Sequence, residues 1–157
     1  MNKKIFFALS VAVVAIAAIG TVSAFDLTDI GSIFGMAPPD QTVTIDGENF
    51  TIPGTFKEND EISNNGTVND YQIFKCTTYS QGYTNDTNYI NILVFDYDTS
   101  DLTDNLINYL NGTSKDISGV KGYMYSDDNG FTYTYAKENK VISIQSDDEN
   151  LIAPVIA

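Results

Sequence analysis

Residues 120–146 contain three runs of alternating apolar and polar side chains, separated by two short turn signals. Asn129-Gly130 is a strong signal for a two-residue hairpin turn, because both residue types tolerate a positive φ. Glu138-Asn139 stands at the corresponding place after the second run. The sequence therefore predicts an antiparallel meander with strands over 120–126, 131–137 and 140–146.

The turn positions also predict which residues face each other across the meander. A turn at Asn129-Gly130 places Asp128 opposite Phe131. Asp127 and Asp128 then form a solvated tip, with no further side chain in view that could help them to bind a metal. A turn at Glu138-Asn139 places Tyr135 opposite Ile142. The predicted core face carries Met124, Tyr133, Tyr135, Ile142 and Ile144.

The opposite face of the predicted meander carries Tyr123 and Tyr125 beside two threonines. Tyrosine contributes a large contact area at low entropic cost, so it is well suited to recognition surfaces. Tyr123 and Tyr125 are therefore the candidate interaction surface.

Four further strands are expected over 43–45, 49–52, 71–79 and 89–97, and the near-continuous apolar run 90–95 indicates a central strand covered on both faces. The polar stretch 57–69 predicts a loop. Residues 101–110 show helical periodicity, and Ser146 begins a capping box before a short helix over 150–156. We expect an α+β fold, an antiparallel β-sheet of about five to seven strands flanked by two or three helices.

Residues 1–24 have the pattern of an export signal: two lysines, an apolar run and the small-residue sequence Val22-Ser23-Ala24. The alternative is an uncleaved anchor, because the apolar run is about as long as a membrane-spanning helix. Residues 25–41 predict a short amphipathic segment with a proline-containing spacer, and residues 42–157 a single domain. The protein is expected at the cell surface or outside the cell, touching the membrane only through an uncleaved N-terminal segment.

The composition excludes several kinds of chemistry. The chain has no histidine, no arginine and one cysteine, Cys76, and its net charge is −13. These absences exclude Ser-His-Asp and Cys-His nucleophile systems, histidine-ligated zinc and arginine phosphate clamps. The negative charge opposes binding to nucleic acid. A lone cysteine in an alternating run is typical of a buried apolar position.

An acidic segment at 96–101 resembles a calcium loop, because carboxylates alternate with hydroxyls. An EF-hand beginning at Asp96 would need glycine where Asp101 stands and glutamate where Ile107 stands. Asp98-Thr99-Ser100 also resembles an aspartic-protease motif, with serine at the position of the required glycine. The simpler interpretation is a strand end followed by a helix cap, so no metal or catalytic residue is assigned.

Four N-x-[ST] sequons offer sites for N-linked glycans in an exported chain. Asn65, Asn85 and Asn111 fall in predicted loops or at a helix end, where a glycan has room. Asn49 borders a predicted strand and is the least favourable of the four.

Two resemblances extend this interpretation. Segments 42–53, 119–125 and 131–144 resemble small exported cell-surface proteins of unknown function from methanogenic archaea. The order of Phe50-Thr51-Ile52-Pro53, Phe56, a helix and the sequence GVKGY resembles the Mog1/PsbP/DcrB-like fold, which usually has tryptophan where Phe56 stands. The second resemblance implies an antiparallel sheet flanked by helices, a fold that hosts binding roles without fixing one.

We therefore expect an exported, acidic cell-envelope protein that acts as a non-catalytic binding or structural module, without a cofactor. Its expected partner is a glycan or protein of the envelope. The alternative is a carboxylate-based hydrolase acting on cell-wall polymer, which would need two acids about 5–9 Å apart across a groove.

Overall fold

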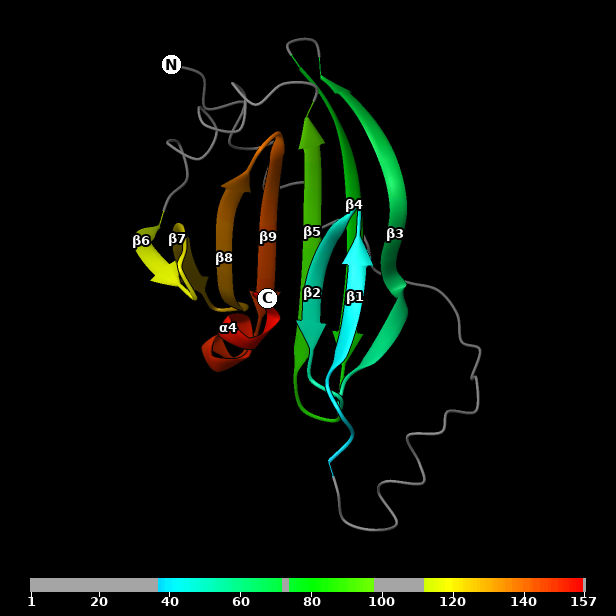
Figure 1. Cartoon of the computed structure of the whole chain (residues 1–157), viewed down its shortest axis with the longest axis vertical. Helices are drawn as coiled ribbons and strands as arrows, with labels where there is room; N and C mark the ends of the chain where they lie inside the picture. Colours follow the sequence, from blue (N-terminus) through cyan, green and yellow to red (C-terminus); the bar gives the residue numbers. More distant parts are fainter. Residues whose placement is uncertain (1–36, 72–73, 98–111, 157) are drawn as a thin grey trace.

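The computed structural model describes residues 37–71, 74–97 and 112–156, and most of them lie in β-strands (Figure 1). The strands are β1 (Gln41–Ile45), β2 (Glu48–Ile52), β3 (Lys57–Tyr71), β4 (Phe74–Thr84), β5 (Tyr89–Tyr97), β6 (Thr113–Ile117), β7 (Val120–Asp127), β8 (Gly130–Lys137) and β9 (Lys140–Ser146). A 3-10 turn, η1 (Glu149–Leu151), continues into one helical turn, α4 (Ile152–Val155).

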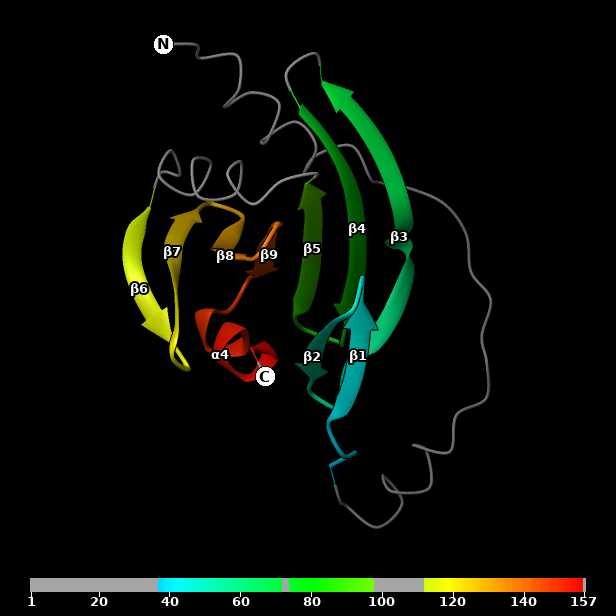
Figure 2. The same ribbon diagram turned by 45° about the horizontal axis from the view of Figure 1, so that its top comes forward.

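Seven strands form one antiparallel sheet, the main sheet, in the order β3-β4-β5-β9-β8-β7-β6. The chain leaves β5 in the middle, re-enters at the far edge as β6, and returns strand by strand until β9 pairs with β5. The β1–β2 hairpin is a separate two-stranded sheet, and it lies with α4 on one face of the main sheet (Figures 1 and 2).

The main hydrophobic core lies between the main sheet and this covering layer. Ile90, Ile92 and Val94 project from β5 into it, and residues of the hairpin and α4 pack on them. Phe50 and Ile52 of β2 are almost wholly buried, which contributes roughly 2 kcal/mol each to docking of the hairpin. A bridge between Phe50 and Ile156 ties the hairpin to the C-terminal turn.

The other face of β5 is buried too, as predicted for a central strand. Leu93, Phe95 and Tyr97 form a second cluster with Cys76 of β4 and Val141 of β9. Burial raises the pKa of the Cys76 thiol, which keeps it protonated and unreactive.

The register of β8 with β9 is confirmed, because Tyr133 pairs with Ile144 and Tyr135 with Ile142. All four side chains are buried in the main core, as predicted, and Met124 packs against them.

The predicted β7–β8 turn is wrong by one residue, because Asp127 pairs with Gly130, and Asp128 and Asn129 form the turn. The Asp127 carboxylate accepts a hydrogen bond of 2.8 Å from the Asn129 amide, which stabilises this turn. Gly130, with φ of 131°, supplies the positive φ after the turn instead of forming its centre. The predicted pairing of Asp128 with Phe131 is therefore absent, although each residue keeps its predicted face.

The predicted α+β fold with two or three flanking helices is wrong for the described residues, whose helical part is limited to η1 and α4. The helical segments expected over 25–36 and 101–110 lie outside the described ranges. The predicted loop 57–69 is strand β3, and the unassigned residues 113–117 are strand β6. Strand β3 lacks an alternating pattern because it lies at an edge, and two register shifts interrupt its pairing with β4.

The C-terminal cap also differs from the predicted capping box. The Asp148 carboxylate accepts the hydrogen bond from the Asn150 amide that opens η1. Ser146 is buried at the end of β9 and donates instead to the Tyr89 backbone oxygen, at 2.7 Å. The capping role therefore belongs to the more exposed aspartate.

Candidate functional site

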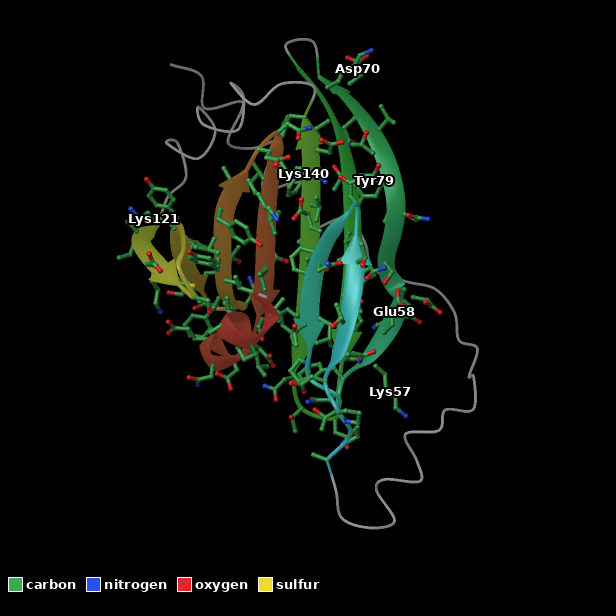
Figure 3. The ribbon with its side chains drawn as sticks, in the orientation of Figure 1. Lys57, Glu58, Asp70, Tyr79, Lys121 and Lys140 are labelled. Carbon is green, nitrogen blue, oxygen red and sulfur yellow. The ribbon has the colours of Figure 1, made fainter. Side chains whose placement is uncertain are left out.

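A polar pocket of about 490 Å³ opens between the tip of β1, the edge strand β3 and the middle of β4. It lies on the same face of the main sheet as the β1–β2 hairpin (Figure 3). Its lining includes the carboxylates of Asp46, Glu58 and Asp60 and contains no lysine. Small-molecule sites are usually concave and mostly apolar, with a few convergent polar groups. This pocket shares the concave form and the convergent polar groups, but its lining is mainly polar.

One wall of the pocket is the turn of the β1–β2 hairpin. Asp46 and Gly47 have φ values of 49° and 79°, the positive φ at both central positions that a tight hairpin turn requires. The Asp46-Gly47 signal is visible in the sequence, and the structure confirms it as the turn.

Lys140 of β9 fixes this turn against the main sheet. Its ammonium lies 3.1 Å from the Asp46 carboxylate and 3.5 Å from that of Glu48, and it also donates to the Asp46 backbone oxygen. Lys137 pairs with the other Glu48 oxygen at 2.6 Å. Burial alone would lower the pKa of Lys140, but the bond to Asp46 and the surrounding negative charges raise it. We call Lys140, Asp46 and Glu48 the turn clamp.

The facing wall is a β-bulge in β3. Asn64 pairs with Ser80 and Thr67 with Thr78, so Asn65 and Gly66 together oppose the single residue Tyr79. Gly66 has φ of 93°, and a Cβ there would lie 3.0 Å from the Tyr79 ring. The ring therefore packs directly on the glycine, and this contact positions both Tyr79 and the bulge. Burial and the charges of Asp46 and Asp96 raise the pKa of Tyr79.

The floor offers hydrogen-bonding groups whose orientation is already set. The Gln81 side-chain oxygen accepts a 2.6 Å hydrogen bond from the Tyr83 hydroxyl, so the amide nitrogen is the end left for a ligand. The Asn64 amide nitrogen donates to the Thr67 hydroxyl at 2.7 Å, which leaves its oxygen as an acceptor. The pocket thus presents an amide donor and an amide acceptor at fixed places, together with the carboxylate of Asp46, which Lys140 holds, and the exposed carboxylates of Glu58 and Asp60.

The groups that line this site suit the binding of a polar molecule. Among the described residues, no group of metal-binding side chains could hold a metal ion. Glu58 and Asp60 are exposed to solvent, whereas Asp46 is engaged by Lys140.

Tyr123 and Tyr125 lie elsewhere, on the face of β7 turned away from the hairpin, because they pair with Thr134 and Thr132 while the neighbouring Met124 packs on the main core. Tyr125 is 46% exposed, and Tyr123 is half-buried. The structure brings these two residues to one strand face but does not bring them to the pocket. The acidic residues Asp127 and Asp128 stand at an exposed hairpin tip.

The predicted sequons have different surroundings. Asn65 is exposed in the β3 bulge, whereas a loop was predicted there. Asn85 lies in the β4–β5 turn, where its side-chain oxygen accepts from the amides of Thr87 and Asn88 at 2.9 and 2.7 Å. Asn111 lies outside the described residues, as do Asp98, Thr99 and Ser100 and the predicted export segment 1–24. Within the described ranges, no helix has the length and apolar character to cross a membrane.

Comparison with protein-family models, curated proteins and solved structures yields no match to this chain. The resemblances to archaeal surface proteins and to the Mog1/PsbP/DcrB-like fold thus stay predictions. The sequence alone did not predict the pocket, because its walls come from three separate stretches of the chain and Lys140, which holds one wall, comes from a fourth.

Proposed function

We propose that the protein is an exported, acidic, non-catalytic binding module of the cell envelope. We further propose that its ligand is a saccharide of that envelope, held in the pocket between β1, β3 and β4. The observation that supports this proposal is the polar lining of the pocket, in which the side-chain amides of Asn64 and Gln81 have fixed orientations. Sugar hydroxyls both donate and accept hydrogen bonds, so they match such a mixed lining.

The charge of the lining narrows the class of saccharide. Asp46, Glu58 and Asp60 contribute negative charge to the pocket, and the whole chain carries −13. An anionic sugar would be repelled both at the site and during approach. We therefore expect neutral sugars and amino sugars to bind, and uronic acids or sulfated sugars to be rejected.

Gln81 is the group most suited to set orientation in this pocket. The Tyr83 hydroxyl holds its oxygen, and Tyr83 is almost fully buried, so the amide is fixed before a ligand arrives. Such pre-organisation improves affinity because less side-chain freedom is lost on binding. Tyr83 acts through Gln81 and is a positioning residue.

The proposal is tested by calorimetric titration of the chain, produced without glycosylation, with neutral oligosaccharides released from the native envelope. Gln81→Met keeps the side-chain length and removes the amide, and it should weaken binding about tenfold, equivalent to one hydrogen bond. Tyr83→Phe should give a smaller loss, because Gln81 stays but is no longer held. Gln145→Met is the matched control, since Gln145 pairs with Asn91 on the opposite face of the main sheet.

Two results would contradict the proposal. Binding that Gln81→Met and Gln145→Met leave equally intact would place the ligand outside the pocket. Shortening of the oligosaccharides by wild-type protein but not by Glu58→Gln or Asp60→Asn would favour the alternative, a carboxylate hydrolase.

A further inference from the structure

Strand β3 presents an open edge of the main sheet (Figure 1). Proteins protect such edges with short strands, charges, prolines or bulges, because the unpaired backbone groups of an edge can pair with another extended chain. The opposite edge, β6, has five residues and carries Lys115 and Asp116. Strand β3 has fifteen residues. Its stretch 64–69 (NNGTVN) holds neither charge nor proline, and its only such protection is the bulge at Asn65 and Gly66.

The exposed stretch of β3 also carries an apolar side chain. Val68 is 71% exposed, the most exposed large apolar residue in the described part of the chain. It pairs with Thr77 on its inner side, within a regular ladder that runs from Thr67 to Tyr71. The first three residues of this ladder, Thr67 to Asn69, are uncharged, and the charge of Asp70 comes only after them. An uncharged stretch with an exposed β-branched residue is a favourable template for strand addition.

A glycosylation sequon lies at this same edge. Asn65-Gly66-Thr67 includes the bulge that faces Tyr79, and a bulge redirects the side chain it carries. Asn65 is exposed, and within the described residues its amide makes no side-chain hydrogen bond. By contrast, the Asn49 amide oxygen accepts from Thr44, and that of Asn85 is held in its turn.

We propose that Asn65 carries an N-linked glycan and that this glycan shields the open edge of β3. Asn65 lies three residues from Val68, about 10 Å along a strand. A chain that adds to the edge must lie about 4.8 Å from β3, in space that a bulky glycan beside the bulge would occupy. The proposal depends on export, which residues 1–24 predict. Asn65 also lines the pocket, so its glycan would lie beside the pocket, whichever ligand the pocket binds.

The modification is a glycosyl transfer from a lipid-phosphate-linked oligosaccharide, catalysed by a membrane transferase. The Asn65 amide nitrogen forms a bond to the anomeric carbon of the sugar. The bond between that carbon and the phosphate oxygen breaks, and the lipid phosphate leaves with the electron pair. The amide proton passes to a base of the transferase or to the leaving phosphate.

The first test is the mass of the Asn65 peptide from protein purified from its native envelope. We expect that peptide to carry the added mass of a glycan. Release of the glycan should then either convert Asn65 to aspartate or return the peptide to its unmodified mass, depending on whether the release is enzymatic or chemical. An unmodified Asn65 peptide in the native protein would overturn the proposal.

The second test concerns the shielding role and uses sedimentation velocity of protein produced in the native host. Asn65→Gln should shift the protein from monomer toward dimers or larger species, and Asn85→Gln should not. Adding Val68→Lys to Asn65→Gln should restore the monomer, because a charge on the edge replaces the glycan. An Asn65→Gln protein that stays monomeric would overturn the shielding role. The titration above uses unglycosylated protein, so the pocket and the glycan can fail separately.

Discussion

Replacing Lys140 with methionine tests how the pocket wall is held. Lys140 is the only one of the three turn-clamp residues that comes from the main sheet, and its ammonium contacts Asp46 and Glu48 across the core edge. Methionine preserves most of the apolar stem, so the substitution removes the charge and the hydrogen bonds with little loss of packing. The hairpin should then be held mainly by Phe50 and Ile52.

The expected loss follows from how far the clamp is shielded from water. The side chains of Lys140, Asp46 and Glu48 are 16%, 20% and 14% exposed. Removing one partner of a fully buried pair costs about 3–5 kcal/mol, whereas an exposed pair contributes below about 1 kcal/mol. Lys137 still neutralises Glu48 in the variant, which limits the loss. We expect a decrease of about 2 kcal/mol in the free energy of unfolding, near 1 M in urea midpoint for a typical slope.

The measurement is urea denaturation of four proteins that form a double-mutant cycle: the wild type, Lys140→Met, Asp46→Asn and the double variant. Asparagine tolerates the positive φ of 49° at position 46, so Asp46→Asn removes charge without straining the turn. The cycle should give a coupling free energy of about 1–2 kcal/mol. Lys75→Met is the matched control, because the pair Lys75–Asp70 is 59% and 64% exposed and should matter by less than about 0.5 kcal/mol. A Lys140→Met loss no larger than that of the control, or a coupling free energy near zero, would refute the clamp.

Three further predictions concern the fold. Burial raises the pKa of Tyr83 and Tyr135, so their stabilising contribution is complete below the unfolded-state pKa of about 10 and is lost as pH rises through the folded-state values. The midpoint of urea denaturation should therefore fall above about pH 10, together with the rise of tyrosinate absorbance. A midpoint that stays constant with pH would contradict this prediction. Gly66→Ala and Gly119→Ala both place alanine at positive φ, but only the first meets a tyrosine ring. In thermal unfolding, Gly66→Ala should therefore lose about 1 kcal/mol more stability than Gly119→Ala. Equal losses in the two variants would argue against the ring contact. Tyr133→Phe removes the hydroxyl that lies 2.6 Å from the Val120 oxygen and should cost about 1–2 kcal/mol in urea denaturation, whereas no change would show that water replaces this bond.

The C-terminal meander is the part of the fold that local sequence predicts best. The pairing of Tyr133 with Ile144 follows from strand alternation and a two-residue turn, which are both local properties. The predicted position of the β7–β8 turn was wrong because an Asn-Gly pair can take two places in a turn. It can occupy both central positions or, as here, the second central position and the residue that follows. The choice depends on the Asp127 carboxylate and on Gly130, where a Cβ would lie 2.4 Å from the Ser146 backbone oxygen.

Strand β3 could not be predicted in the same way. Its residues are polar because an edge strand is partly solvated, and the bulge at Asn65 and Gly66 disrupts the alternation that marks a strand. Its conformation is set by pairing with β4, a tertiary effect that outweighs local propensity.

The pocket could not be predicted from the sequence either, because it depends on contacts between distant segments. The Asp46-Gly47 turn is recognisable locally, but Lys140 reaches it across 94 positions of the chain. Tyr79 gains its place only when Gly66 packs under its ring. Such contacts between distant segments are created by sheet topology, which was only partly predicted.

The most direct test of the central claim is a map of backbone amide chemical shifts during titration with a neutral envelope oligosaccharide. We predict saturable shifts concentrated at the Asp46-Gly47 turn, the Asn64–Gly66 bulge and Gln81. Little change is expected in β7, on the face that carries Tyr123 and Tyr125. Shifts concentrated at Tyr123 and Tyr125, or no saturable shifts with any neutral envelope saccharide, would contradict it.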